Sequence, residues 1–219
     1  MPEWGRARLP CSHFGKKNEM AVMIKKVGVI GSGQMGNGIA HVAALAGYDV
    51  ALHDVSPDRL KSAMATINGN LTRQAAKNVI TEAAHKKALS RIEANESLDG
   101  LADCDLVIET AIEKEDVKRK IFQDLCAILK PEAIIGSDTS SISITRLAAS
   151  TDRPERFIGI HFMNPVPLME LVELVRGIAT DDATFEAARE FVTSLGKQIA
   201  VSEDFPAFIV NRILLPMIN

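Results

Sequence analysis

Short apolar runs rich in β-branched residues alternate along this chain with longer segments whose apolar residues recur every three or four positions. The short runs are typical of strands buried on both faces, and the longer segments are typical of amphipathic helices. Such alternation predicts an α/β protein built on a doubly wound, mostly parallel sheet. The expected strands are Lys26–Ile30, Asp49–His53, Asp105–Ile108, Ala133–Ser137, Phe157–Phe162, Met169–Val175 and Lys197–Val201.

The connection between the second and third of these strands is unusually long and almost wholly helical in pattern, from Pro57 to Leu89. Ser56 followed by Pro57 predicts the start of one helix, and Thr81 is a candidate N-cap for a second. A single crossover helix would not need this length. We therefore expect a helical hairpin that projects from the sheet as an arm and is a candidate to contact substrate.

Composition excludes several classes of protein. Lys and Arg number 25 against 28 acidic residues, a net charge of −3, and no basic block suggests nucleic acid as a partner. No apolar run reaches the roughly 18 residues of a membrane span. Cys11, Cys104 and Cys126 are odd in number and lack a C-x-x-C spacing, so neither a disulfide framework nor a metal site is expected. Their use favours a reducing compartment, and we predict a cytoplasmic protein.

A glycine-rich turn follows the first strand at once: Gly31-Ser32-Gly33-Gln34-Met35-Gly36 leads directly into a helical pattern. A strand, a G-x-G-x-x-G turn and a helix in succession indicate a dinucleotide site, with the pyrophosphate at the helix N-terminus. Gly31 permits the tight turn, Gly33 lets the backbone approach the phosphates, and Gly36 allows close packing of helix on strand. The alternative is a glycine turn selected for packing alone.

The second strand ends in Asp54, eighteen residues after Gly36. A carboxylate in this position accepts hydrogen bonds from the adenosine ribose hydroxyls and repels a 2′-phosphate, so the sequence favours NAD over NADP. The alternative is an ordinary turn residue at a strand end.

One histidine is a candidate general base. His161 ends a buried strand pattern, and the turn Asn164–Pro167 separates that pattern from a second strand that contains Glu173. If the strands pair as a hairpin centred near Pro167, His161 and Glu173 lie opposite one another. A buried carboxylate needs a partner, and Glu173 would fix the imidazole tautomer and stabilise the imidazolium. A purely structural His–Glu pair is the alternative.

Together these residues resemble the L-3-hydroxyacyl-CoA dehydrogenase family, and within it the bacterial 3-hydroxybutyryl-CoA dehydrogenases. The resemblance rests on four blocks and runs from about Met23 to Asn219. The blocks are the glycine turn, Asp138-Thr139-Ser140-Ser141, His161-Phe162-Met163-Asn164-Pro165-Val166-Pro167 with Glu173, and Phe208-Ile209-Val210-Asn211-Arg212.

The resemblance implies a Rossmann-type domain that uses NAD to oxidise an (S)-3-hydroxyacyl-CoA to the 3-ketoacyl-CoA. His161 would be the general base and Glu173 its partner, while Ser140 and Asn211 would bind the substrate oxygen. Glu113 and Lys118 would lie near the nicotinamide end of NAD. The arm would meet CoA, with the candidate cations Lys61, Arg73, Lys77, Lys86 and Lys87. Read without the resemblance, Ser140 caps a helix and Asn211 is a helix-surface residue.

The resemblance also sets the expected domains. Residues 1–22 are expected to be a disordered extension, residues 23–205 the NAD-binding domain, and residues 206–219 the first helix of a truncated, all-helical domain that forms a homodimer in full-length members. Two positions depart from the family pattern: Asp138 stands in place of the usual Asn and is expected to place a charge near the nicotinamide, and Ala207 replaces a glycine and is expected to restrict a hinge.

Two other functions stay open at this point. The chain could bind NAD without turnover, or it could act on a hydroxy acid that carries no CoA.

Overall fold

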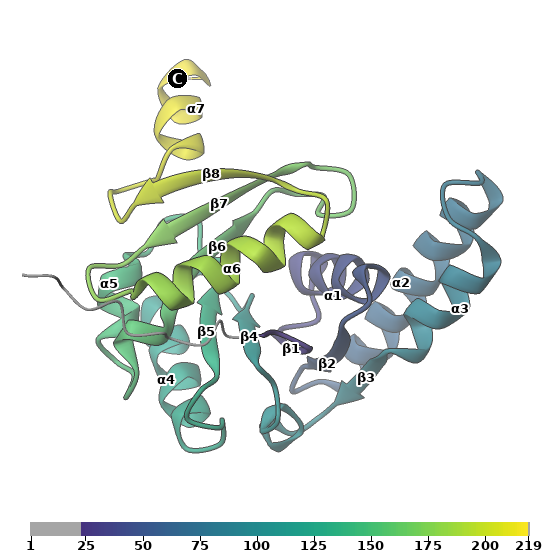
Figure 1. Cartoon of the computed structure of the whole chain (residues 1–219), viewed down its shortest axis with the longest axis horizontal. Helices are drawn as coiled ribbons and strands as arrows, with labels where there is room; N and C mark the ends of the chain where they lie inside the picture. Colours follow the sequence, from purple (N-terminus) through teal and green to yellow (C-terminus); the bar gives the residue numbers. More distant parts are fainter. Residues whose placement is uncertain (1–22, 219) are drawn as a thin grey trace, which may run out of the picture.

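The computed structural model describes residues 23–218, so the extension expected over residues 1–22 lies outside the described residues. One eight-stranded sheet organises the molecule, in the order β3-β2-β1-β4-β5-β6-β7-β8 (Figure 1). The strands are β1 (Lys26–Ile30), β2 (Asp49–His53), β3 (Ile92–Asn95), β4 (Leu106–Glu109), β5 (Ile134–Ser137), β6 (Phe157–Phe162), β7 (Leu171–Arg176) and β8 (Gln198–Glu203).

The strand directions confirm the predicted doubly wound sheet. Every neighbouring pair is parallel except β6 and β7, which pair antiparallel as the turn at Asn164–Pro167 predicts. The expected strands are confirmed with ends that differ by at most two residues. Strand β3 was not expected from the sequence. It is an edge strand whose middle residues Glu93 and Ala94 are exposed, so it lacks the continuous apolar run of the central strands.

Helices cover both faces of the sheet and enclose two apolar cores. On one face α1 and α6 pack with the β-sheet, and the apolar faces of α2 and α3 extend this core outward; α4 and α5 cover the other face. The helices are α1 (Gln34–Ala46), α2 (Pro57–Ala76), α3 (Glu82–Ser90), α4 (Glu115–Cys126), α5 (Ile144–Ala148), α6 (Asp182–Ser194) and α7 (Val210–Ile218). Within residues 23–218, no helix has both the length and the apolar character needed to cross a bilayer.

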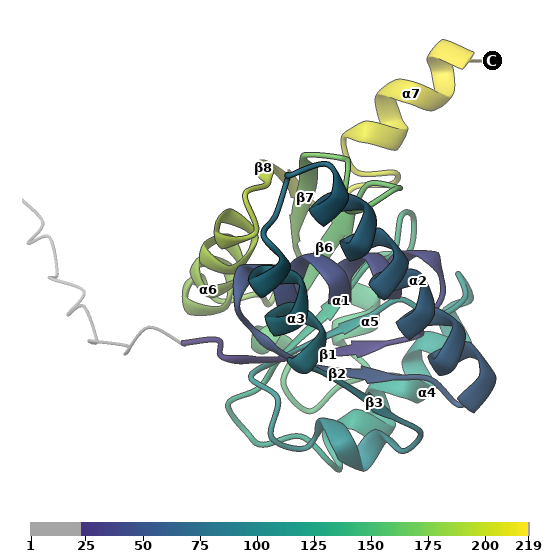
Figure 2. The same cartoon turned by 90° about the vertical axis from the view of Figure 1, so that its right-hand side faces the viewer.

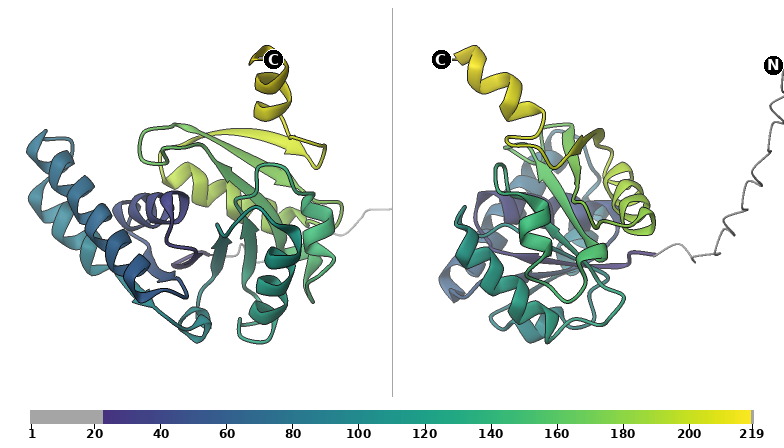
Figure 3. Two further views of the ribbon diagram at one scale, coloured as in Figure 1. Left: turned by 180° about the vertical axis from the view of Figure 1, so that it is seen from behind. Right: turned by 90° about the vertical axis from the view of Figure 1, so that its left-hand side faces the viewer.

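The predicted helical arm is confirmed as the antiparallel pair α2 and α3, which extends beyond the sheet on the side of β3 (Figures 1 and 3). Both expected caps form: the Ser56 hydroxyl accepts from the Arg59 amide at 3.4 Å, and the Thr81 hydroxyl accepts from the Ala84 amide at 3.1 Å. Leu60, Ile67 and Leu71 bury the inner side of α2 against the apolar core on the α1 side of the sheet. The arm is therefore held in a fixed position relative to the sheet.

The last helix, α7, projects away from the domain (Figures 1 and 2). It contains no buried residue, and Ile213, Leu214 and Leu215 are each about half exposed. Its first turn nonetheless lies against the ends of β6 and β7.

Candidate active site

The glycine turn forms a backbone cradle between β1 and α1. Gly31 has a φ of 90° in the left-handed region, and its amide donates to the His53 carbonyl at 2.8 Å. A Cβ on Gly36 would lie 1.7 Å from the Gly31 carbonyl oxygen, whereas a Cβ on Gly33 would meet no atom within 4 Å. The space above Gly33 is thus open at the N-terminus of α1, where no side chain caps the helix. Such a cradle fits a pyrophosphate.

Gln34 and Met35 form the first turn of α1 beside this cradle. Gln34 is exposed, and Met35 is partly buried against the apolar core on the α1 side of the sheet. Gln34 is therefore accessible at the start of the helix, while Met35 contributes to the packing of the helix.

Asp54 lies beside the cradle at the end of β2. Its Oδ2 accepts from the amide and the hydroxyl of Ser32, both at 2.9 Å, and its Oδ1 accepts from the Ser56 amide at 3.0 Å. Burial acts to raise the pKa of Asp54, but these hydrogen bonds and Arg59 outweigh burial and hold the pKa below its ordinary value. The carboxylate is thus ionised and fixed in place, as the recognition of a ribose diol requires.

A cavity of about 470 Å³ opens next to Asp54 and the glycine turn. Its walls are mainly apolar, and their side chains come from β2, α4 and the segment after β4; they include Val55, Ile112, Val117 and Ile121. A largely apolar cavity that borders a carboxylate suits an adenosine moiety. The sequence motif predicts Asp54 but not these apolar residues, because apolar side chains scattered over three segments form no local pattern.

The predicted His–Glu pair forms in the antiparallel pair β6 and β7. His161 and Glu173 are register partners, and His161 Nδ1 lies 2.7 Å from Glu173 Oε2. Glu173 is fully buried and His161 is 7% exposed. Burial acts to raise the pKa of Glu173, but the hydrogen bonds from His161 and from the amides of Val210 and Ile209 hold it below its ordinary value. Glu173 is therefore an acceptor, and His161 donates through Nδ1 and leaves Nε2 free.

The candidate oxygen-binding residues Ser140 and Asn211 are 71 positions apart in sequence but adjacent in space. Asn211 Nδ2, on the first turn of α7, donates to the Ser140 carbonyl at 3.1 Å. The ring of Phe208, which precedes α7, lies edge-on to the His161 ring with centroids 6.0 Å apart. One short segment therefore connects the loop after β5 with the His–Glu pair.

Glu113 organises the loop that contains Ser140. Its Oε1 accepts from the Thr139 hydroxyl at 2.5 Å, from the Ser140 amide at 3.1 Å and from the Ser141 amide at 3.2 Å. Burial acts to raise the pKa of Glu113, but the hydrogen bond from Thr139 and the charge of Lys118 contribute to holding it below its ordinary value. Glu113 thus has a structural role in shaping the loop after β5.

Lys118 is buried beneath the same loop. Its Nζ lies 2.7 Å from Glu109 Oε1 and 3.4 Å from Glu113 Oε2, and it donates to the Ala111 carbonyl at 3.2 Å. Glu109, fully buried at the end of β4, was missed by the sequence analysis. The sequence did contain a clue to Glu109, because it is an acid at the end of an apolar strand. The same kind of pattern, an acid within an apolar strand, predicted that Glu173 is buried with a partner.

Asp138 lies between this cluster and the His–Glu pair. Its Oδ1 accepts from the Phe162 amide at 2.7 Å, which ties the end of β5 to the end of β6. Burial raises the pKa of Asp138 well above its usual range; the nearby Glu109 and Glu113 act in the same direction, and Lys118 acts against them. The raised pKa favours the neutral acid over the carboxylate, whereas the sequence led us to expect a charge at this position.

A second cavity, of about 510 Å³, lies between the arm and the turn that joins β6 to β7. Arg73 and Lys77 line it from α2 and its end, and Pro165, Pro167 and Leu168 line it from the turn. Of the five cations expected to meet CoA, the lining contains these two and not Lys61, Lys86 or Lys87. Over residues 23–218, no group of three or more His, Cys, Asp or Glu is arranged to hold a metal ion.

Comparisons with known proteins agree with this geometry. Residues 26–205 match the family model described as 3-hydroxyacyl-CoA dehydrogenase, NAD binding domain. The chain is 83% identical over 200 residues to a 3-hydroxybutyryl-CoA dehydrogenase of Bradyrhizobium diazoefficiens, a match that covers 91% of this chain and 68% of that protein. A probable 3-hydroxybutyryl-CoA dehydrogenase of Deinococcus radiodurans is 47% identical over 194 residues, covering 89% of this chain and 69% of the relative.

Among solved structures, the (S)-3-hydroxybutyryl-CoA dehydrogenase of Ralstonia eutropha superposes with a TM-score of 0.88 at 47% identity, covering 90% of this chain and 69% of that one. The resemblance stated from the sequence motifs is thereby confirmed, as is the Rossmann-type fold. The chain belongs to the 3-hydroxyacyl-CoA dehydrogenase family and carries its NAD-binding domain.

Proposed function

We propose that this protein is an NAD-dependent dehydrogenase that oxidises (S)-3-hydroxybutyryl-CoA to the 3-ketoacyl-CoA. The family membership supports the reaction class, and the names of its relatives, 3-hydroxybutyryl-CoA dehydrogenases, support the short acyl chain. The single observation that carries the proposal is the buried His161–Glu173 pair at the ends of β6 and β7.

The cofactor-binding part of the proposal uses the cradle and the cavity beside it. The backbone from Gly31 to Gly36, with Gln34 and Met35 in the first turn of α1, would hold the pyrophosphate, and Asp54 would accept from the adenosine ribose. Glu113 and Lys118 would border the nicotinamide end. NAD, when bound, accepts a hydride from C3 of the substrate.

His161 would act as the general base. With its Nδ1–H donated to Glu173, its Nε2 lone pair is available to take the proton of the 3-hydroxyl group. The Glu173 carboxylate would then stabilise the imidazolium that results, since it is ionised and lies 2.7 Å away. In the reverse direction the same Nε2–H would protonate the 3-keto oxygen.

Ser140 and Asn211 would hold the substrate oxygen, because a hydroxyl and a side-chain amide are suitable donors to an oxygen that gains or loses negative charge. The contact between Asn211 and the Ser140 carbonyl supports this pairing.

The second cavity supports CoA as the substrate handle. Its cations, Arg73 and Lys77, suit phosphate groups, while Pro165, Pro167 and Leu168 suit the apolar parts of the pantetheine arm. A hydroxy acid without CoA would leave both sets of side chains unused, so we favour an acyl-CoA over such a substrate.

The experiment measures NADH oxidation by the purified chain with acetoacetyl-CoA and, in parallel, with free acetoacetate. We expect turnover with the thioester alone, together with saturable NADH binding by fluorescence. Turnover of both substrates at similar efficiency would favour the dehydrogenase of a non-CoA hydroxy acid. NADH binding with no turnover at high protein concentration would favour the NAD-binding module without catalysis.

The family resemblance further leads us to propose that full-length members form a homodimer and that this protein is located in the cytoplasm. Cys104 is buried and Cys126 half-buried, and both are free thiols, which suits a reducing compartment. Sedimentation and cell fractionation test these two points.

A further inference from the structure

Glu173 makes two sets of contacts, and the proposed function uses only one of them. Its Oε2 accepts from His161, while its Oε1 accepts from the backbone amides of Ile209 at 2.9 Å and Val210 at 2.8 Å. Val210 is the first residue of α7, so these amides are among those that a helix N-terminus leaves without an intrahelical partner. One fully buried carboxylate thus orients the imidazole and caps a helix.

The segment that leads into α7 has few other attachments to the domain. The helix itself contains no buried residue. Two further contacts reach the candidate catalytic residues: the hydrogen bond from Asn211 to the Ser140 carbonyl and the ring of Phe208 against His161. Phe208 is also buried in the apolar core that α4 and α5 cover, so the segment is attached to the domain next to the His–Glu pair.

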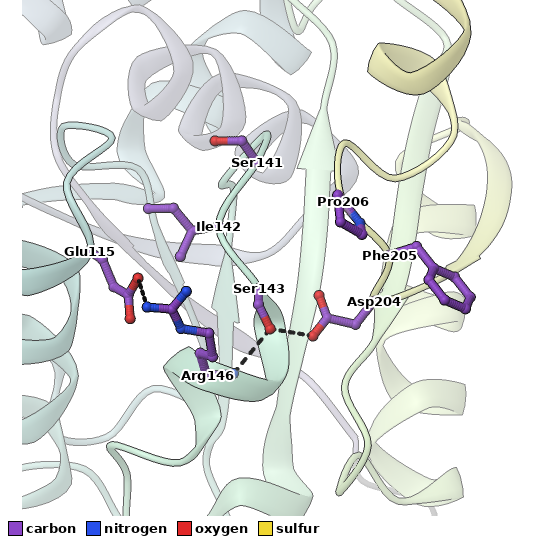
Figure 4. A pocket seen from close by; sticks show the side chains of 8 residues that line it. All are labelled: Glu115, Ser141, Ile142, Ser143, Arg146, Asp204, Phe205 and Pro206. Carbon is purple, nitrogen blue, oxygen red and sulfur yellow. Dashed lines mark hydrogen bonds and ion pairs between the residues drawn. The ribbon is translucent and has the colours of Figure 1, made fainter.

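The root of this segment is fixed separately. Asp204 accepts from the Ser143 hydroxyl at 2.6 Å and from the amides of Ile144 at 2.9 Å and Thr145 at 2.8 Å, which anchors it to the start of α5. Figure 4 shows Asp204 directed at Ser143 beside Phe205 and Pro206, along a cavity of about 340 Å³. The segment is therefore fixed at two points, at Asp204 by its bonds to α5 and at Ile209 and Val210 by their bonds to Glu173.

Between these two fixed points the backbone is strained. Ala207 has a φ of 65° and Phe208 a φ of 48°, both in the left-handed region that residues with a Cβ adopt at a cost of about 1 kcal/mol or more each. A glycine at position 207 would adopt this conformation without that cost, and the expectation that Ala207 restricts a hinge stays a prediction. Such strain persists only where surrounding contacts hold it, and the bonds to Glu173 are the contacts that follow it directly.

We infer that the amides of Ile209 and Val210 are positioning groups for the His161–Glu173 pair, so that docking of α7 and alignment of the pair are one coupled event. This inference rests on the proposed function, since it assigns the pair a role in proton transfer. Coupling of this kind is reciprocal: whatever releases α7 frees the carboxylate to rotate, and whatever neutralises Glu173 weakens the hold on α7.

The first test removes one amide donor. Proline is tolerated at the first position of a helix, so Val210→Pro deletes one N–H that faces Glu173, and Val210→Ala is the matched control that keeps it. Carbon-13 NMR of the Glu173 carboxyl group should give a higher pKa in the Pro variant than in the Ala variant. We expect at least about a threefold change in proton affinity, because a donor to the ionised form has been lost. Equal pKa values in the two variants would overturn the inference.

The second test runs the coupling in the other direction and does not depend on the Pro variant. Hydrogen exchange of the amides from Ile209 to Leu215 is compared between the wild-type chain and Glu173→Ala, with the β1 amides as an internal reference. We expect exchange in the α7 segment to accelerate at least tenfold relative to that reference. Unchanged relative exchange at Ile209 and Val210 would contradict the coupling.

Both measurements use the protein without cofactor or substrate. A failure here therefore leaves the proposed reaction standing, and a chain that fails to oxidise NADH with acetoacetyl-CoA leaves the coupling testable.

Discussion

The two halves of the site are built in different ways. The proposed nucleotide-binding half comes from one contiguous turn, Gly31–Gly36, whose functional groups are backbone atoms, with Asp54 added from the end of the neighbouring strand. The proposed catalytic half combines side chains from four distant segments, Ser140, His161, Glu173 and Asn211. The first half is therefore specified by local chain geometry, while the second depends on strand register and on the docking of α7.

The largest effect is expected from breaking the catalytic half alone. His161→Gln removes the base and should lower kcat by between about 10² and 10⁴-fold, because the base acts in the transition state. The dissociation constant for NAD should stay within about twofold of the wild-type value. Steady-state kinetics and calorimetric titration check this, and a large loss of NAD affinity would mean that the histidine is mainly structural.

Gly36→Ala tests the nucleotide-binding half. The added Cβ would lie 1.7 Å from the Gly31 carbonyl and 2.8 Å from Thr110 Oγ1, so the turn must shift. We expect the dissociation constant for NADH to rise by about 10- to 100-fold, the range that overpacking energies imply.

Gly69→Ala, on α2, is the control for this variant. A Cβ there would have only the flexible end of Arg73 within 4 Å, at 3.8 Å. NADH binding should be unchanged in the control; fluorescence titrations that give the two variants the same affinity would be inconsistent with the cradle.

A smaller change is expected at Asp54, where the nucleotide-binding half does depend on a side chain. Asp54→Ser removes the charge that repels a 2′-phosphate, and the preference for NADH over NADPH should fall by about tenfold. Parallel binding titrations with the two nucleotides measure the ratio. An unaltered ratio would exclude Asp54 from ribose recognition.

A different kind of effect, on stability, is expected at Asp138, which ties the ends of β5 and β6 together beside His161. Its pKa is raised in the folded protein, so the folded state binds this proton more tightly than the unfolded state does. The resulting stabilisation is present at low pH, below the unfolded pKa, and is lost as pH rises through the raised folded pKa.

Asp138→Asn does not titrate, and its amide oxygen can still accept from Phe162. The variant should gain free energy of unfolding relative to the wild type as pH rises from about 4 to 8, by about 1.4 kcal/mol for each unit of pKa shift. Urea denaturation at several pH values measures the difference. A difference that stays constant with pH would show that Asp138 is ionised as usual.

The sequence predicted those helices and strands whose apolar or helical pattern runs without interruption. The central strands and the arm were predicted because each has an uninterrupted apolar or helical pattern with clear caps, such as Ser56 and Thr81. Strand β3 was not predicted, since Ile92 is its only buried residue and a largely exposed edge strand lacks that pattern.

For the site, the sequence predicted residues whose chemistry is unusual for their position. His161 and Glu173 were identified because an acid within an apolar strand needs a partner, and the antiparallel register between β6 and β7 confirms the pairing. Contacts across long separations gave no such signal. Local pattern could not predict the hydrogen bonds from the amides of Ile209 and Val210 to Glu173, nor the burial that raises the pKa of Asp138.

The tautomer of His161 tests the catalytic arrangement most directly, and two-bond nitrogen–proton NMR of the imidazole ring reports it without substrate or cofactor. If Glu173 accepts from Nδ1, the neutral ring should carry its proton on Nδ1, and Glu173→Gln should change that distribution. A neutral ring protonated on Nε2 would have no lone pair on that nitrogen for a substrate hydroxyl and would contradict the assignment of His161 as the base. A tautomer indifferent to the substitution would contradict the role of Glu173 in orienting the ring.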